Sequence, residues 1–182
     1  MEPLAPLPSA VRALLRHSGA RPRLVAHLTL VHDVACHIVD RFAAVWPKLS
    51  FDHDAVRYGA ATHDIGKVAH PEELRQPGHL HEDAGERLLR DHGVSAERAR
   101  FARTHAQWAD DGEPWMEDLL VALADTWWRG KRDVALEEAI CRHIMAHTGE
   151  PTWRVFAMLD DIAAEVTADA DVRLAWQNRR QA

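Results

Sequence analysis

The adjacent pair His63-Asp64 is where the sequence most readily allows metal chemistry. Four small residues, 59–62, precede the pair, so the helix that carries it can approach its neighbours closely and bury both side chains. Neighbouring residues on a helix project about 100° apart, so an imidazole and a carboxylate can take adjacent positions on one ion. An octahedral ion, with ligand angles of about 90°, such as manganese or ferrous iron, suits this geometry better than a tetrahedral zinc.

The balance of other ligand types points the same way. The chain has 13 histidines but only two cysteines, Cys36 and Cys141, which form no CxxC pair. Neither a disulfide framework nor a structural zinc knuckle is therefore indicated. Asp125 follows the apolar run 119–124, and a carboxylate is costly to bury there alone. We expect either a metal ion or an arginine from another helix beside it.

Two further histidines, His27 and His32, lie on the long helix expected from Pro22 towards Trp46. They flank the apolar face of that helix on its two sides, so helical phase alone does not choose between them as a metal ligand.

The segment Thr62-His63-Asp64-Ile65-Gly66-Lys67 resembles the signature of the HD-domain metal-dependent phosphohydrolase superfamily. The order of the other ligands in that family also has counterparts here. The family's upstream histidine matches His32, 31 residues before His63, and its late aspartate matches Asp125. A subset of the family adds two intervening histidines, for which His81 and His105 stand in order. The resemblance covers residues 24 to about 130.

This resemblance implies a metal centre and a reaction. A first ion would be held by His32, His63, Asp64 and Asp125, and Asp64 would bridge to a second ion held by His81 and His105. We expect one or two divalent ions per chain, from manganese, iron, cobalt, nickel or magnesium, with zinc less favoured. Metal-activated water would then attack a phosphate ester or anhydride, with Asp64 and Lys67 as the catalytic residues.

Three residues are candidates for substrate binding. Lys67 follows Gly66 and can extend towards a phosphate as a compact positive charge. Trp128 and Arg129 lie three and four residues after Asp125, hence on its helix face, where an indole and a guanidinium would suit a nucleotide. The alternative is an exposed lysine and a core tryptophan beside a solvated basic turn. The expected partner is a small phosphorylated molecule, with a nucleotide favoured.

Two other functions stay open. A di-iron centre on the same ligands could activate oxygen instead of hydrolysing phosphate, and a non-catalytic module could use the fold to bind nucleotides or to signal. The chain lacks the Gly-Tyr-Pro segment of the cyclic-di-GMP branch of the family, which disfavours that substrate.

The apolar residues recur at helical spacing almost throughout, so the sequence predicts an all-α fold of the HD-domain type. We expect one domain over residues 1–182, with a metal core at about 22–130 and a helical extension at 131–182. Ser9, Asp52, Ser95 and Asp133 are candidate N-caps, and Gly66, Gly93 and Gly149 are candidate helix ends. The helices are expected from 9 to about 19, 22 to 46, 52 to 66, 80–92, 95–108, 114–129, 133–148, 151–168 and 171–180, with a loop of 68–79 that has room for one helical turn.

Composition argues against several classes of function and location. With 22 basic and 28 acidic residues, the chain has a formal net charge of −6, which argues against a general nucleic-acid surface. The mean hydropathy is −0.33, and neither a membrane span nor a signal peptide is indicated, so a cytoplasmic location is expected. Trp153, Phe156 and Trp176 could cover the metal domain or pair two subunits as a homo-oligomer.

Overall fold

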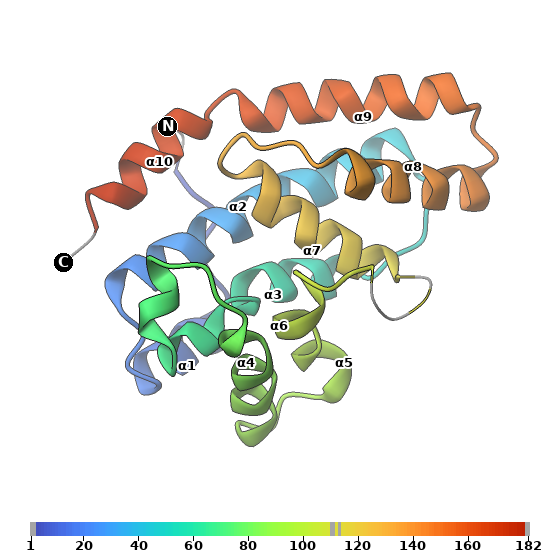
Figure 1. The fold of residues 1–182 in the computed structure, drawn as a ribbon. Helices are drawn as coiled ribbons and strands as arrows, with labels where there is room; N and C mark the ends of the chain where they lie inside the picture. The colour runs from blue at the N-terminus through green and yellow to red at the C-terminus, as the bar shows by residue number, and fades with distance from the viewer. Residues whose placement is uncertain (1–2, 110–111, 113, 181–182) are drawn as a thin grey trace.

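The computed structural model describes residues 3–109, 112 and 114–180, and within these ranges the chain is helical and contains no strand (Figure 1). The all-α prediction is therefore confirmed. The helices are α1 (Ser9–His17), α2 (Pro22–Val45), α3 (His53–Thr62), the 3-10 turns η1 (Ile65–Val68) and η2 (Pro71–Leu74), α4 (Leu80–Asp91), α5 (Ala96–Ala99), α6 (Phe101–Thr104), α7 (Met116–Trp127), α8 (Val134–Thr148), α9 (Thr152–Thr167) and α10 (Ala170–Asn178).

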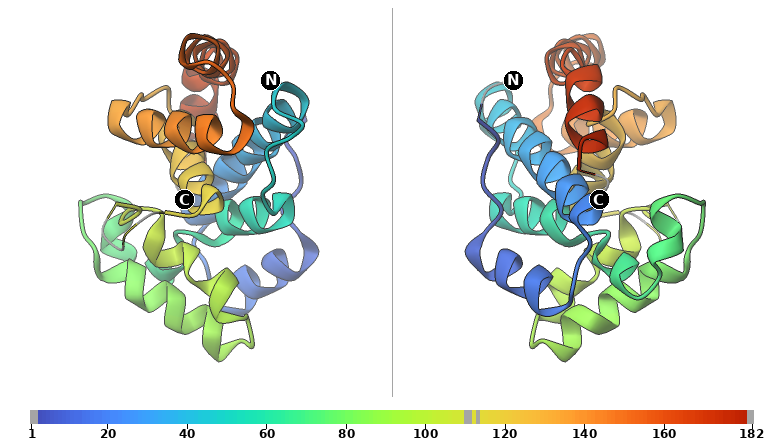
Figure 2. Two further views of the ribbon diagram at one scale, coloured as in Figure 1. Left: turned by 90° about the vertical axis from the view of Figure 1, so that its right-hand side faces the viewer. Right: turned by 90° about the vertical axis from the view of Figure 1, so that its left-hand side faces the viewer.

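Helices α2, α3 and α7 pack against one another at the centre of the molecule. Figures 1 and 2 show α8 and α9 on one side of this centre, and α4, α5 and α6 on the other. The apolar face predicted for α2 is confirmed, since all six of its residues are fully buried: Leu24, Leu28, Val31, Ala35, Ile38 and Phe42. Burial of this face holds the helix that carries His27 and His32 against the core.

Local capping chemistry explains where several helices begin. The carboxylate of Asp52 accepts hydrogen bonds from the backbone N–H groups of Asp54 and Ala55, both at 2.9 Å, and α3 begins at the next residue. Asp133 caps α8 by accepting from Leu136 N at 3.1 Å. The prediction for Ser9 is wrong, because Pro8 is the N-cap of α1 and Ser9 is its first helical residue. Ser95 does occupy the N-cap position of α5, but its side chain makes no capping hydrogen bond to the described residues.

Gly66 differs from its predicted role as the left-handed end of a helix. Helix α3 ends at Thr62, and Gly66 lies within η1 without a positive φ. A Cβ atom at Gly66 would lie 1.9 Å from the carbonyl oxygen of His81 and 2.5 Å from the backbone nitrogen of Gly85. Glycine is therefore required because η1 and α4 touch backbone to backbone, which fixes His81 relative to Asp64.

Gly149 does end α8 in the left-handed conformation, with φ of 71°, and Gly93 has φ of 80° directly after the end of α4. The expected helix at 95–108 is divided into α5 and α6, and the expected loop at 68–79 contains the short turn η2. Among the helices that the structure describes, none combines the length and the apolar character needed to cross a bilayer.

The Gly66 contact predicts a steric defect. Gly66→Ala should lower the free energy of unfolding by about 2 kcal/mol or more, because backbone must move to admit the methyl group. Gly93→Ala is the control, since a Cβ there meets open space and only the backbone conformation is strained. Urea unfolding of the two variants compares the effects. Equal destabilisation would show that the η1–α4 contact does not constrain Gly66.

Candidate metal centre

Six polar side chains from separate elements converge between α2, α3 and α7. His27 comes from α2, His63 and Asp64 follow the end of α3, and Asp125 comes from α7. His81 lies in the first turn of α4, and His105 directly follows α6. All but His27 and Asp125 are buried at the residue level, and those two are half-buried. We call these six residues the His/Asp cluster.

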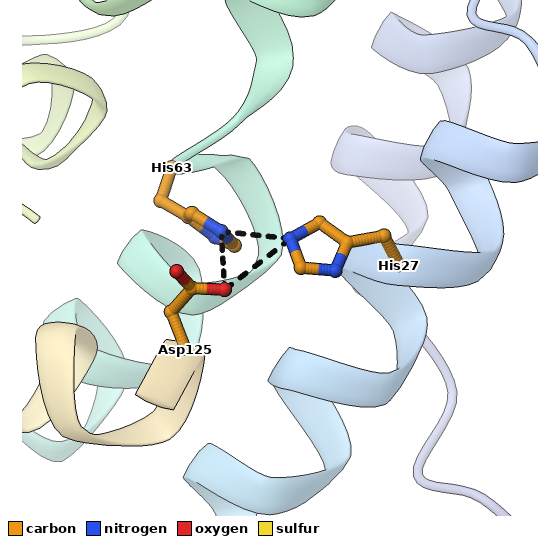
Figure 3. Close-up of side chains that lie close together, drawn as sticks. All are labelled: His27, His63 and Asp125. Carbon is orange, nitrogen blue, oxygen red and sulfur yellow. Dashed lines mark hydrogen bonds and ion pairs between the residues drawn. The ribbon is translucent and has the colours of Figure 1, made fainter. Parts of the chain in front are cut away.

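Three of them form one side of the cluster (Figure 3). The Nε2 atom of His27 lies 3.2 Å from Nε2 of His63 and 3.3 Å from Oδ1 of Asp125. Nε2 of His63 lies 3.4 Å from the same Asp125 oxygen. The three ligand-type atoms thus face one another across a small gap, as the donors of a metal site do.

Asp64 joins this group to the remaining histidines. Its Oδ2 atom lies 3.0 Å from Nε2 of His27 and 2.5 Å from Nζ of Lys67. Its Oδ1 atom lies 3.0 Å from Nε2 of His81 and 3.7 Å from Nε2 of His105. The two carboxylate oxygens therefore face opposite halves of the cluster, as a bridging ligand would.

The outer ring nitrogens fix which atom each imidazole presents to the centre. His63 and His105 direct Nδ1 to the backbone oxygens of Ala60 and Phe101, at 2.9 and 3.2 Å. Because a carbonyl oxygen can only accept, each Nδ1 must carry the proton and donate it. The neutral ring then presents the lone pair of Nε2 to the cluster, which is the arrangement that metal-bound histidines use.

Glu73 performs the same task for His81. Its Oε2 atom accepts from Nδ1 of His81 at 2.6 Å and from the backbone N of His81 at 3.1 Å. With the proton on Nδ1, Nε2 of His81 presents a lone pair to the buried Oδ1 of Asp64. Among the residues that the structure describes, neither atom has a hydrogen-bond partner of acceptable geometry, despite the 3.0 Å that separates the two. Two facing lone pairs repel unless a cation lies between them or His81 takes a second proton.

The cluster also shifts the pKa values of its members. Burial alone would lower the pKa of His27, but hydrogen bonds to Asp125 and Asp64 and their negative charges raise it to about 9. Burial and the nearby His63 lower the pKa of His105 to about 4. For Asp64 and Asp125, burial would raise the pKa, yet the contacts with His63 and the hydrogen bonds from His27 hold it well below its usual range. Without a metal, a proton on His27 thus helps to balance the two carboxylates.

The structure corrects the choice of His32. Its Nδ1 lies 3.0 Å from the backbone oxygen of Arg57, its Nε2 lies 3.6 Å from the thiol of Cys36, and it does not join the cluster. His32 lies five positions after His27, which corresponds to about 140° around the helix, so the two side chains cannot both face one centre. The spacing of the resembled family selected His32, whereas the structure places His27, the other histidine that phase had left open, in the cluster. The other predicted ligands, His63, Asp64, His81, His105 and Asp125, are brought together.

The predicted substrate residues lie at the mouths of the cluster. A pocket of about 280 Å³ is lined by His27, Asp64 and the three candidates Lys67, Trp128 and Arg129. Trp128 is buried, with its ring 5.1 Å from that of His27, whereas Arg129 is exposed. A second pocket, of about 320 Å³, reaches the cluster on the side of His81, His105 and Asp125. Asp64 and Lys67 line both pockets.

Glu73 is the functional candidate that sequence reasoning missed. It lies in the segment expected to be a loop, and no periodicity connects it to His81. The available signal is chemical: a buried histidine ligand needs an acceptor for its second ring nitrogen, and carboxylates close in sequence are candidates.

Comparison with known proteins adds no assignment. The chain matches no protein-family model, and no solved structure matches it significantly. The resemblance to the HD-domain superfamily therefore rests on the motif residues of the sequence alone.

The two shifted histidines predict distinct titrations in metal-free protein. His27 should stay protonated up to about pH 9, and His105 should stay neutral down to about pH 4. Histidine side-chain NMR of chelator-treated protein measures both. Asp125→Asn should lower the pKa of His27 because it removes one of its two anionic partners, while Asp40→Asn, an exposed change elsewhere on α2, should not. A pKa of His27 near 6.5 in the unaltered chain would contradict the arrangement.

Proposed function

We propose that the chain is a metal-dependent phosphohydrolase of the HD-domain type, acting on a small phosphorylated molecule such as a nucleotide. One observation carries the proposal: four imidazole Nε2 atoms and two carboxylates converge, within 3.0 to 3.7 Å of their nearest partners, at the point where the HD-like motif lies. Three of the four rings have the outer nitrogen held by an acceptor, which leaves Nε2 to face the other members of the cluster.

The donor set fits a divalent ion. It mixes imidazole nitrogens with carboxylate oxygens and has no thiolate, as suits manganese, iron, cobalt or nickel. In this proposal His27, His63, Asp64 and Asp125 hold the first ion, and Asp64, His81 and His105 hold a second. Bound ions would supply an activated water and charge stabilisation for the displaced oxygen. The unpaired contact between Nε2 of His81 and Oδ1 of Asp64 is the local feature that such an ion would satisfy in place of a second proton on His81.

The residues that line the pocket of about 280 Å³ could bind the phosphate of the substrate. Lys67, Arg129 and Arg23 line it, so that three positive charges surround the approach to Asp64 and His27. Guanidinium groups can bind phosphate oxygens with two parallel hydrogen bonds, whereas the lysine acts as a point charge. Trp128 supplies an apolar wall beside them.

Metal content tests the proposal directly. Protein purified without chelator should contain between one and two divalent ions per chain, and His27→Ala should lose most of them. His32→Ala is the matched control, being the same change on the same helix with the side chain outside the cluster. A stoichiometry near two would support His81 and His105 as ligands. Equal metal loss in both variants, or no bound metal in the unaltered chain, would refute the assignment.

Substrate turnover separates hydrolysis from the alternatives. A nucleotide screen with Mn²⁺ in the absence of oxygen should detect phosphate release. Iron content together with oxygen consumption, and no phosphate release, would instead favour an oxygenase. Nucleotide binding to metal-loaded protein without turnover would favour a binding module.

Arg129 provides a test of the substrate side. Arg129→Ala should raise KM for the phosphorylated substrate about tenfold with little change in kcat, because a charge-assisted contact to phosphate is lost. Lys131→Ala is the control. It removes the same charge two residues further along the chain, and the Lys131 side chain does not line the pocket. Unchanged kinetics in Arg129→Ala would remove this residue from the substrate site.

A further inference from the structure

A separate pocket lies where the beginning of α2 meets η2. It has a volume of about 480 Å³ and is lined by three arginines, Arg21, Arg23 and Arg75, together with Glu72 and Leu74. In Figure 1 the green segment that contains η1 and η2 lies beside the N-terminal end of α2. The pocket therefore joins two segments that are about fifty residues apart in the sequence.

The charges around this pocket are unbalanced. Within the described part of the chain, no carboxylate lies at ion-pair distance from any of the three guanidinium groups. Glu72, the acidic residue of the lining, contacts His70 instead, at 3.4 Å. The first turn of α2 adds no acid and has no side-chain cap, so its backbone contributes further positive potential. This local excess contrasts with the net charge of −6 of the whole chain.

The arginine pocket is continuous with the approach to the His/Asp cluster. Arg23 and Leu74 line both this pocket and the one that contains His27 and Asp64. Positive side chains thus follow one another from Lys67 and Arg129 over Arg23 to the distal pair Arg21 and Arg75.

The second pocket, on the side of His81 and His105, has a more acidic lining. Asp64 and Lys67 line both mouths, but this one adds the acids Glu82, Asp125 and Asp133 and no arginine, whereas the other adds Arg23 and Arg129 and the single acid Glu73. An anionic group is repelled there and attracted on the arginine side. The charge distribution therefore gives a substrate one direction in which its anionic part can extend.

We propose that Arg21, Arg23 and Arg75 form a distal anion site that holds a second phosphate of the substrate while the reacting phosphate lies at the cluster. The substrate class is then a molecule with at least two separate phosphate groups or a polyphosphate chain, and not the monophosphate of a neutral alcohol. The placement of the reacting phosphate at the His/Asp cluster rests on the proposed function. The distal site rests on the pocket and its arginines alone.

Binding to chelator-treated protein tests the distal site without any metal. Inorganic tripolyphosphate should bind more tightly than orthophosphate in calorimetry at low ionic strength, because it can contact several of the arginines. Arg21→Ala combined with Arg75→Ala should weaken tripolyphosphate binding about tenfold or more. Arg142→Ala combined with Arg154→Ala removes the same charge from exposed positions on α8 and α9 and should leave binding unchanged.

Equal affinity in the distal double variant and the unaltered chain would overturn the proposal, as would equal losses in the two double variants. Arg75→Ala alone, which leaves the beginning of α2 intact, should still weaken binding, and retained affinity in it would also count against the site. If metal and hydrolysis are absent but the distal variants alone lose tripolyphosphate, the proposed function fails and the anion site stands. If hydrolysis is present and tripolyphosphate binding does not depend on these arginines, the proposed function stands and the distal anion site fails.

Discussion

Burying the carboxylate of Asp64 at the centre of a helical fold costs free energy that its neighbours must offset. Its side chain is 3% exposed, and its two oxygens contact groups from α2, η1 and α4, with His105 after α6 close by. A proton on His27 and the ammonium of Lys67 can balance the charge in metal-free protein, and the proposed divalent ion would do so when bound. The central helices thus bring compensating groups from three elements to one buried carboxylate.

This requirement explains why so many polar residues lie inside the molecule. The rings of His63, His81 and His105 are buried, but each has an outer nitrogen that donates to a carbonyl or carboxylate. Such acceptors remove most of the cost of burying an imidazole and hold the ring in one orientation. Glu73 shows that this support extends beyond the residues that face the centre.

Features that depend on nearby residues could be predicted from the sequence. The helical pattern, the caps at Asp52 and Asp133 and the left-handed Gly149 follow from local propensity, and the structure has them. The small residues before His63 also predict its burial correctly, since a Cβ on Gly59 would lie 2.7 Å from Phe101 and Val121. Candidate ligands could be recognised by type, because few other side chains bind metals.

Features that depend on tertiary contact could not be predicted. His27 and His32 lie at equivalent positions relative to the apolar face, and only the placement of α3 and α7 decides which one reaches the cluster. Gly66 resembles a helix-ending glycine in sequence, yet its role arises from a helix fifteen residues further on. The partnership of Glu73 with His81 requires the path of the intervening turn, which no periodicity encodes.

The close contact between Gly66 and the backbone at His81 fixes the cluster at a point in the chain that is separate from the surface turn carrying Arg75. It sets the distance between the halves of the cluster, and the segment that connects them, residues 67–80, reaches back to the cluster through Lys67 and Glu73. The rest of that segment, which carries Arg75, can change in charge while the His/Asp cluster keeps its geometry. Under the proposed function, substrate preference would then diverge by exchange of residues in one surface turn.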